Sequence, residues 1–270
     1  MFDRGIEIKT RDQIESMRAA GLVVGQTLEL LRGSAVAGVT TAQLDAIAHD
    51  FIRSCGATSN FLGYHGFPGV ICTSVNEEVV HGIPGPRVLR DGDVLSIDCG
   101  AIIDGWHGDA ATTVAIGEVT DADLGLMQAT EEALWRGIGA AALGGRVSDI
   151  SHAVETTIQA AGPYGIVEGY TGHGIGSAMH QPPNVANYGR PGRGPKLVKG
   201  LALAVEPMVT MGTDETRTLA DDWTVVTADG SRAAHYEHTF TLTDRGAWVL
   251  TALDGGAARL AELGVPYGGH

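Results

Sequence analysis

The segment covering residues 93–115 constrains the fold of this chain more than any other, because it predicts a hairpin that carries two carboxylates. Its two strand-like runs are separated by Asp104-Gly105, a dipeptide favoured in two-residue hairpin turns. Such a turn pairs Gly100 with Asp109 and places Asp98 on the same face, diagonally across the strands. Aspartate is depleted in strands, and two such charges on a buried face repel each other unless a cation lies between them. A hairpin whose aspartates simply face solvent is the alternative.

Composition and charge exclude several classes of protein. The chain has 270 residues, enough to bury a sizeable core in one large domain or two small ones. Acidic residues outnumber basic ones by 32 to 18, so no basic surface for nucleic acid or an anionic membrane is expected. The N-terminal sequence MFDRGIEIKT lacks the apolar core of a signal peptide, and no apolar run approaches the roughly 20 residues that span a bilayer.

The cysteine count bears on the cellular compartment. The chain contains three cysteines spread along its length, Cys55, Cys72 and Cys99. An odd number in a chain of this size favours free thiols in a reducing compartment over a disulfide framework. We therefore expect a cytoplasmic protein with no nucleic-acid partner and no membrane partner.

The same order of predicted elements occurs twice along the chain. A helix that begins with a capping box formed by Thr10 and Gln13, and a second helix near residues 40–56, precede the hairpin. Two further helices, near residues 121–138 and 148–161, follow it. When the first helix pair is aligned on the second, three apolar positions coincide: Leu44 with Ile150, Ala48 with Val154, and Ile52 with Ile158.

Two short motifs extend this repeat beyond the helices. His81-Gly82-Ile83 has a counterpart in His173-Gly174-Ile175, and residues 91–98 align without a gap on residues 199–206, so that an acid ends each strand. We predict an α+β fold of two halves related by a pseudo-twofold axis, about residues 10–118 and 119–251. Each half has two helices, a strand bearing a histidine and a hairpin bearing acids. The halves share a central antiparallel-rich sheet with helices on its outer face.

The remaining segments of both halves are assigned from their composition. Residues 70–80 are expected to form one strand-like segment. Residues 223–227 and 232–243 are expected to complete the second hairpin, which makes Glu237 the counterpart of Asp109. The Pro- and Gly-rich residues 181–196 and the polar residues 213–222 are expected to be surface loops.

The predicted repeat brings Asp98 and Asp109 from one half against Glu206 and Glu237 from the other, with His173 nearby. Four carboxylates and one imidazole cannot all stay ionised in an empty pocket, and divalent cations would remove the repulsion. Oxygen ligands with one imidazole suit Co, Mn, Fe or Zn as divalent ions, and shared carboxylates can hold two metals about 3.5–4 Å apart. The sequence therefore predicts a two-metal site that activates a water molecule.

Five motifs closely resemble those of type I methionine aminopeptidases, in the family's order and over about residues 8–251. They are VVHGIP at 79–84, SIDCGAIIDGWHGDAATT at 96–113, GYTGHGIGSAMHQPP at 169–183, AVEPM at 204–208 and YEHT at 236–239. The resemblance implies the pita-bread fold, a duplicated unit around a two-metal centre, as a single catalytic domain over residues 1–270. We expect no zinc-binding N-terminal extension of the kind that some relatives carry, and therefore no docking on the ribosome through one.

The resemblance also implies roles for the predicted ligands. Asp109 and Glu237 correspond to the carboxylates that bridge the two metals. Asp98 corresponds to a ligand of one metal, and His173 with Glu206 to ligands of the other. Glu206 also corresponds to the catalytic group that takes the proton of the attacking water.

Two further histidines match catalytic, substrate-binding residues of the family that are not metal ligands. His81 resembles the histidine that contacts the amide nitrogen of the scissile bond, and His180 the one near its carbonyl oxygen. Six more residues resemble the substrate-binding pocket for the methionine side chain, although an apolar core cluster is the alternative: Phe61, Tyr64, Phe67, Cys72, Met179 and Trp223.

Three positions depart from the family's common pattern. Met179 stands where an aromatic residue is common, and Phe61 and Thr171 replace residues that are often cysteine. A flexible side chain at Met179 would alter the fit of a substrate without touching the metals.

The function implied by the resemblance is removal of the N-terminal, initiator methionine from nascent proteins and peptides, preferably when the second residue is small. The enzyme would be a monomer that uses two divalent metal ions. One alternative is a proline-directed peptidase of the same fold, but such relatives carry a large N-terminal domain, whereas the first helix here starts near residue 10. The other is a metal-free peptide-binding homologue, although all five ligand positions are filled.

Overall fold

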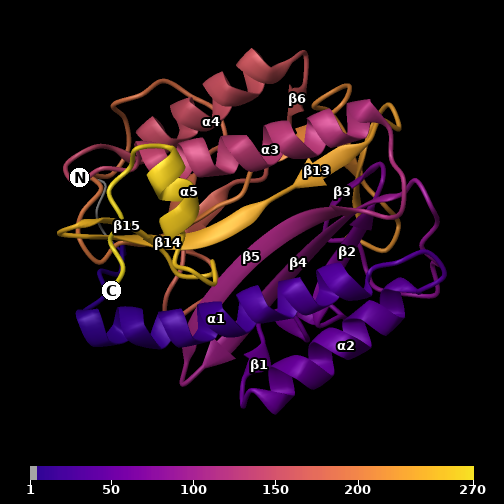
Figure 1. Ribbon diagram of the computed structural model, residues 1–270, viewed down its shortest axis with the longest axis horizontal. Coiled ribbons are helices and arrows are strands. Elements are labelled where there is room, and N and C mark those ends of the chain that lie inside the picture. The colour runs from indigo at the N-terminus through magenta and orange to yellow at the C-terminus, as the bar shows by residue number, and fades with distance from the viewer. Residues whose placement is uncertain (1–4) are drawn as a thin grey trace.

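The computed structural model describes residues 5–270, so the first four residues of the N-terminal sequence discussed above lie outside the described residues. One antiparallel sheet of nine strands runs through the molecule (Figure 1). In spatial order its strands are β1 (Thr58–Ser59), β4 (Val94–Ile103), β5 (Trp106–Ala115), β14 (Glu237–Thr243), β9 (Ala202–Val205), β7 (Gly172–Gly174) and β8 (Gln181–Val185), while β2 (Ile71–Val75) pairs with β4 and β15 (Gly246–Val249) with β14. The expected α+β class and antiparallel sheet are confirmed.

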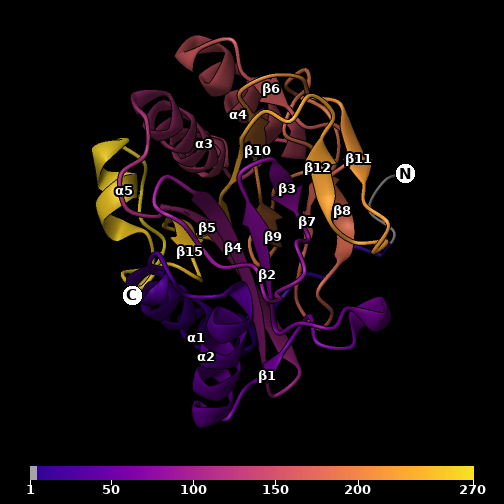
Figure 2. The ribbon, with the colours of Figure 1, turned by 90° about the vertical axis from the view of Figure 1, so that its right-hand side faces the viewer.

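Helices from both halves of the chain cover one face of this sheet (Figure 2). They are α1 (Arg11–Ser34), α2 (Thr41–Ser54), α3 (Asp121–Ala140), α4 (Val147–Ala161) and α5 (Ala257–Glu262). The predicted capping box at the start of α1 is confirmed, because Gln13 N donates to Thr10 Oγ1 and Thr10 N donates to the Gln13 side chain. Among the described residues, no helix combines the length and the apolar composition that crossing a bilayer requires.

The core lies between the helices and the sheet, and the aligned positions of the repeat form part of it. All six are buried, with exposed fractions of 0 or 1%: Leu44, Ala48, Ile52, Ile150, Val154 and Ile158. Each fully buried Leu or Ile side chain stabilises the fold by about 1.5–3 kcal/mol through removal of apolar surface from water. The same helical spacing therefore anchors α2 in the first half and α4 in the second.

The hairpin formed by β4 and β5 has the predicted turn and register. Asp104 and Gly105 both have positive φ angles, 49° and 79°, as a type I′ turn requires. Gly100 pairs with Asp109, and Asp98 pairs with Ala111. The alternative of a solvent-facing hairpin is wrong, because Asp109 is only 3% exposed.

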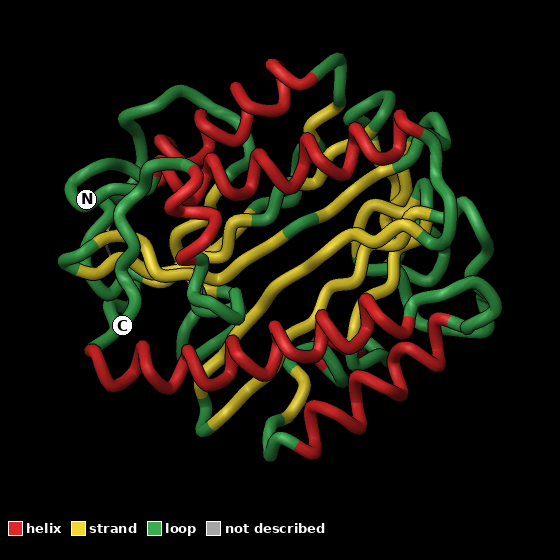
Figure 3. The backbone as a smooth tube through the Cα atoms, viewed as in Figure 1, coloured by secondary structure: helices red, strands yellow, loops and turns green. Residues whose placement is uncertain are grey.

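The two halves of the chain meet where β5 pairs with β14, and Glu237 lies opposite Ala111. In Figure 3 these long strands run side by side between the helices of the first half and those of the second. β14 also pairs with β9, with His238 opposite Val205, so β9 and β14 form the second acid-bearing strand pair. The carboxylates of both halves therefore come from neighbouring strands of one sheet.

The expectation that residues 223–227 complete this second hairpin is wrong. They contain β12 (Val225–Thr227), which pairs instead with β3 (Glu78–Val80) and β11 (Thr216–Thr218) in a separate three-stranded sheet. Val225 packs with Val79 and Val80 in a small apolar cluster, whereas the place beside β9 is taken by the longer strand β14. Burial of these valines decides the pairing.

Three other expectations need correction. The segment 70–80 is two strands, β2 and β3, because Asn76 turns the chain with a φ of 61° and accepts a hydrogen bond from Val94 N. His81 follows β3 instead of lying in a strand, whereas His173 lies in β7. The supposed loops 181–196 and 213–222 contain the strands β8 and β11. The other elements are a 3-10 helix (Tyr64–Gly66) and a third sheet of β6 (Gly165–Ile166), β10 (Met208–Thr210) and β13 (Ala233–His235).

Candidate metal centre

Four strands and the end of a fifth bring the predicted metal ligands to one cavity. Asp98 lies in β4, Asp109 in β5, His173 in β7 and Glu237 in β14, and Glu206 directly follows β9; all five line the same cavity. The neighbour of Asp109, Gly108, faces helix α1, so the alternation of a strand turns the Asp109 side chain away from the helices. The cavity therefore opens on the face of the sheet that the helices leave free.

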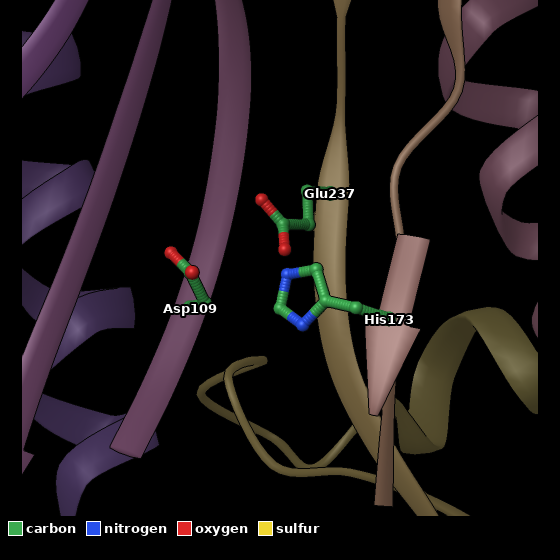
Figure 4. A group of neighbouring side chains, drawn as sticks. All are labelled: Asp109, His173 and Glu237. Carbon is green, nitrogen blue, oxygen red and sulfur yellow. The ribbon is translucent and has the colours of Figure 1, made fainter. Parts of the chain in front are cut away.

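The geometry of three of these side chains suits a shared ion. Figure 4 shows Asp109, His173 and Glu237 beside one another, each on a different strand. One potential ligand atom of each lies within 4.8 Å of those of the other two. His173 Nδ1 lies 3.0 Å from Gly174 O, and its Nε2 lies 3.4 Å from Glu206 Oε1. A carbonyl oxygen can only accept, so His173 donates from Nδ1 and keeps the lone pair of Nε2 for a ligand.

The electrostatics of the cavity favour a cation. Burial raises the pKa of Asp98 to about 7. Burial, and then the charges of neighbouring carboxylates, raise the pKa values of Asp109, Glu206 and Glu237 well above the ordinary range. Among the described residues, no hydrogen-bond partner reaches Asp98 Oδ1, Asp109 Oδ1 or Glu237 Oε1. Divalent ions would bind these oxygens and neutralise the mutual repulsion, so the residues present fit a metal centre.

The two predicted non-ligand histidines also line this cavity. His81 directly follows β3 with a φ of 60°, and burial lowers its pKa to about 4. His180 follows Met179 on the loop after β7, and its ring centre lies 4.4 Å from that of His173. Burial, with the nearby His65, also lowers the pKa of His180. Both imidazoles are therefore neutral at physiological pH and each can donate one hydrogen bond.

Apolar side chains form the other side of the cavity. All six predicted pocket residues line it: Phe61, Tyr64, Phe67, Cys72, Met179 and Trp223. The aromatic rings meet edge to face, with centroids 6.5 Å apart for Phe61 and Phe67 and 5.0 Å apart for Phe67 and Trp223. They belong to a cluster separate from the large cores. An apolar pocket thus adjoins the carboxylates, and its role in binding a substrate stays a prediction.

Several residues near the centre were not predicted. His65 and Val80 line the cavity. His235 is 1% exposed, and its Nε2 lies 3.9 Å from Glu206 Oε2. Side chains two residues apart in an extended chain lie on the same face, so the position of His235 two residues before Glu237 could have indicated that it faces the metal centre. Asn187 donates from Nδ2 to Glu206 O at 3.0 Å, and no pattern in the sequence pointed to it.

Residues 15–244 match the profile of metallopeptidase family M24. The methionine aminopeptidase of Clostridium acetobutylicum is 53% identical over 91% of this chain and 98% of its own length. Methionine aminopeptidase 1 of Mycobacterium tuberculosis is 51% identical over 92% of this chain and 96% of its own.

Solved structures show the same fold. The methionine aminopeptidase of Thermotoga maritima superimposes with a TM-score of 0.90 at 40% identity, over 92% of this chain and 99% of that one. A prolidase from Pyrococcus furiosus superimposes with a TM-score of 0.74 at 20% identity, over 90% of this chain and 65% of that one. The second likeness shows the fold alone.

Proposed function

The chain belongs to metallopeptidase family M24, and from that membership we propose that it is a methionine aminopeptidase, which removes the N-terminal methionine from peptides and newly made proteins. The relatives from Clostridium acetobutylicum and Mycobacterium tuberculosis carry that name and match more than nine tenths of the chain. One structural observation supports the proposal most. A cluster of carboxylates and an imidazole shares a single cavity with an apolar pocket of the kind that receives one side chain.

The proposed metal ligands are the five residues that surround the polar side of the cavity. Asp109 and Glu237 would be shared between two divalent ions, Asp98 would bind one of them, and His173 with Glu206 would bind the other. Bound ions of this kind supply Lewis acidity, which lowers the pKa of a water molecule and polarises a carbonyl group. The donor set accepts Co, Mn, Fe or Zn, so the choice of ion would follow from availability in the cell.

The protein groups proposed for the reaction are Glu206, His180 and His81. The Glu206 carboxylate accepts the proton that the attacking water loses. His180 donates a hydrogen bond to the oxygen of the scissile carbonyl group, where negative charge develops. His81 contacts the nitrogen of the same bond and stays neutral because burial lowers its pKa to about 4.

The apolar side of the cavity is proposed to bind the methionine side chain. Phe61, Phe67 and Trp223 supply flat, rigid walls, and Met179 supplies a flexible one. We expect peptides with a small second residue to be preferred, as the family resemblance implies.

The test is cleavage of a peptide that begins Met-Ala-Ser. In the presence of divalent metal, the chain should release methionine from it. The N-acetylated peptide should be resistant, because an aminopeptidase needs the free amine. Equal cleavage of both peptides would exclude an aminopeptidase, and preferential cleavage of an Xaa-Pro peptide would favour a proline-directed peptidase instead.

A second measurement separates the enzyme from a metal-free binding protein of the same fold. Elemental analysis of the purified chain should find divalent metal, and Asp109→Ala should lose it. A metal-free protein whose peptide binding is unchanged by Asp109→Ala would favour the binding protein.

A further inference from the structure

Tyr64 contributes its ring to the apolar pocket, but its hydroxyl group reaches a histidine. The Tyr64 hydroxyl oxygen lies 2.8 Å from His180 Nδ1, a distance typical of a strong hydrogen bond. The two ring centres are 5.4 Å apart and the ring planes meet at 62°, so the rings are not stacked. Tyr64 therefore contacts His180 through a hydrogen bond to Nδ1. Such a bond can fix both the tautomer and the orientation of the imidazole.

The proton of this hydrogen bond can be assigned by counting donors. A neutral imidazole has one N–H group, so one nitrogen of His180 donates and the other accepts. Among the described residues, Tyr64 has no other hydrogen-bond partner for its hydroxyl group. Donation from the phenol to Nδ1 satisfies both groups and leaves the imidazole proton on Nε2. The opposite tautomer would leave the phenol proton without an acceptor in the protein.

His173 is set in the opposite way by a different neighbour. Its Nδ1 donates to Gly174 O, so its Nε2 carries a lone pair directed to the carboxylates. The rings of His173 and His180 lie 4.4 Å apart, yet their Nε2 atoms differ: that of His173 carries no proton and that of His180 carries one. The bare Nε2 of His173 suits a metal, and the protonated Nε2 of His180 suits a substrate oxygen.

We propose that Tyr64 is a positioning residue that holds His180 with Nε2–H available to the oxygen of the scissile carbonyl group. This role rests on the proposed function and adds to it a residue that acts through His180, beyond packing against methionine. A donor already fixed before the substrate arrives stabilises the developing charge without reorganising, so loss of the phenol hydroxyl should slow turnover more than it weakens binding.

The kinetic test is Tyr64→Phe, which keeps the ring and removes only the hydroxyl group. For a Met-Ala-Ser peptide, kcat should fall by about tenfold, the worth of one hydrogen bond. KM should stay within about threefold because the apolar wall is preserved. The matched control is Tyr170→Phe, whose ring centre lies 5.8 Å from that of His81 but whose hydroxyl makes no hydrogen bond within residues 5–270. Its kcat should change by less than about twofold.

The second readout does not depend on activity. In the metal-free protein, nitrogen-15 NMR should show His180 with a proton on Nε2 and none on Nδ1, and His173 with the reverse. The His180 signals are identified by their loss in His180→Asn. Tyr64→Phe should shift the Nδ1 signal of His180 and leave His173 unchanged.

Two results would overturn the proposal: a proton on His180 Nδ1 in the unsubstituted protein, or a Tyr64→Phe variant with unchanged kcat and an unchanged His180 signal. The expected signals in a protein that releases no methionine would instead contradict the proposed function and leave the assignment of Tyr64 to His180 standing.

Discussion

Asp109 occupies a position that favours binding a cation over stability of the empty fold. Its side chain is 3% exposed, and its Oδ1 has no hydrogen-bond partner within the described residues. Burial raises its pKa most, followed by the charges of Asp98 and Glu206. A buried carboxylate without a compensating charge costs free energy of folding, whereas the same carboxylate is a strong ligand once an ion is present.

We predict that Asp109→Asn separates these two effects. The amide cannot bridge two cations, so bound metal should be lost and turnover should fall by about 100-fold or more. The metal-free variant should nevertheless melt higher than the metal-free unsubstituted chain, on the order of 2–4 °C, because the amide is neutral by itself, whereas the buried carboxylate must take up a proton on folding to lose its charge. Elemental analysis and thermal unfolding measure the two quantities. Asp104→Asn, at the exposed turn of the same hairpin, is the control and should change neither.

Local pattern was sufficient to predict the position of Asp109 but not that of every residue at the centre. The turn at Asp104-Gly105 fixes the register of the hairpin, and the register alone pairs Asp109 with Gly100. Asn187 comes near Glu206 through contacts made far away in the sequence. The hydrogen bond from Tyr64 to His180 has the same origin, because it joins residues separated by more than 100 positions.

Among the elements, helix α1 packs on strand β5 where two glycines, Gly21 and Gly108, face each other. A Cβ on Gly108 of β5 would lie 2.8 Å from Gly21 N, and a Cβ on Gly21 would lie 2.2 Å from Leu250 O. Real Cβ atoms do not approach backbone this closely. Gly108 therefore sets the distance between α1 and β5, the strand that carries Asp109, and Gly21 sets the distance between α1 and Leu250, just after β15.

We predict that Gly21→Ala destabilises the protein by about 1–3 kcal/mol, because α1 must move away from the backbone of Leu250 to admit the methyl group. Gly33→Ala, in the same helix, is the matched control. Its Cβ would meet nothing within 4 Å, and alanine is the better helix former, so stability should be unchanged or raised by up to about 1 kcal/mol. Urea unfolding of both variants measures the difference. Equal stabilities would mean that the glycine contact does not hold α1 in place.

The elements that sequence reasoning placed correctly are those with a strong local period. The helices with buried Leu44 and Ile150 and the hairpin with its I′ turn all have such a signal. The strands β8, β11 and β12 have five residues or fewer, and their partners lie elsewhere in the chain. A strand of three residues takes its conformation from the neighbour that buries it, so its own residues carried too little information.

At the scale of the whole molecule, two halves meet along β5 and β14 and place four acids around one cavity. We propose that the chain acts as one catalytic domain for this reason, since neither half holds the complete set.

The same cavity contains buried histidines. Burial lowers the pKa of His81 and of His173 to about 4, and that of His235 to about 3. Histidines and carboxylates therefore make the stability of the metal-free fold depend on pH with opposite signs.

The signs follow from which state binds more protons. For the histidines, the unfolded chain binds protons below its ordinary pKa of 6.5 and the folded chain does not, so stability is lost as the pH falls from 6.5 toward 4. For the carboxylates, the folded chain retains protons that the unfolded chain has released. Their contribution is lost as the pH rises, from about 4 through about 7 for Asp98 and further for the others.

We therefore predict that the melting temperature of the metal-free protein falls as the pH rises above about 7, where the histidine contribution is already complete and only the carboxylates still change. Divalent metal takes the place of the protons on the carboxylates, so the melting temperature of the metal-loaded protein should not fall over the same range. The increase in melting temperature that metal causes should thus be larger at pH 8 than at pH 6. Thermal unfolding with a chelator and with excess divalent ion measures this increase. Asp109→Asn should reduce it at every pH, whereas an increase that is the same at pH 6 and pH 8 would show that the four acids do not release protons to the metal.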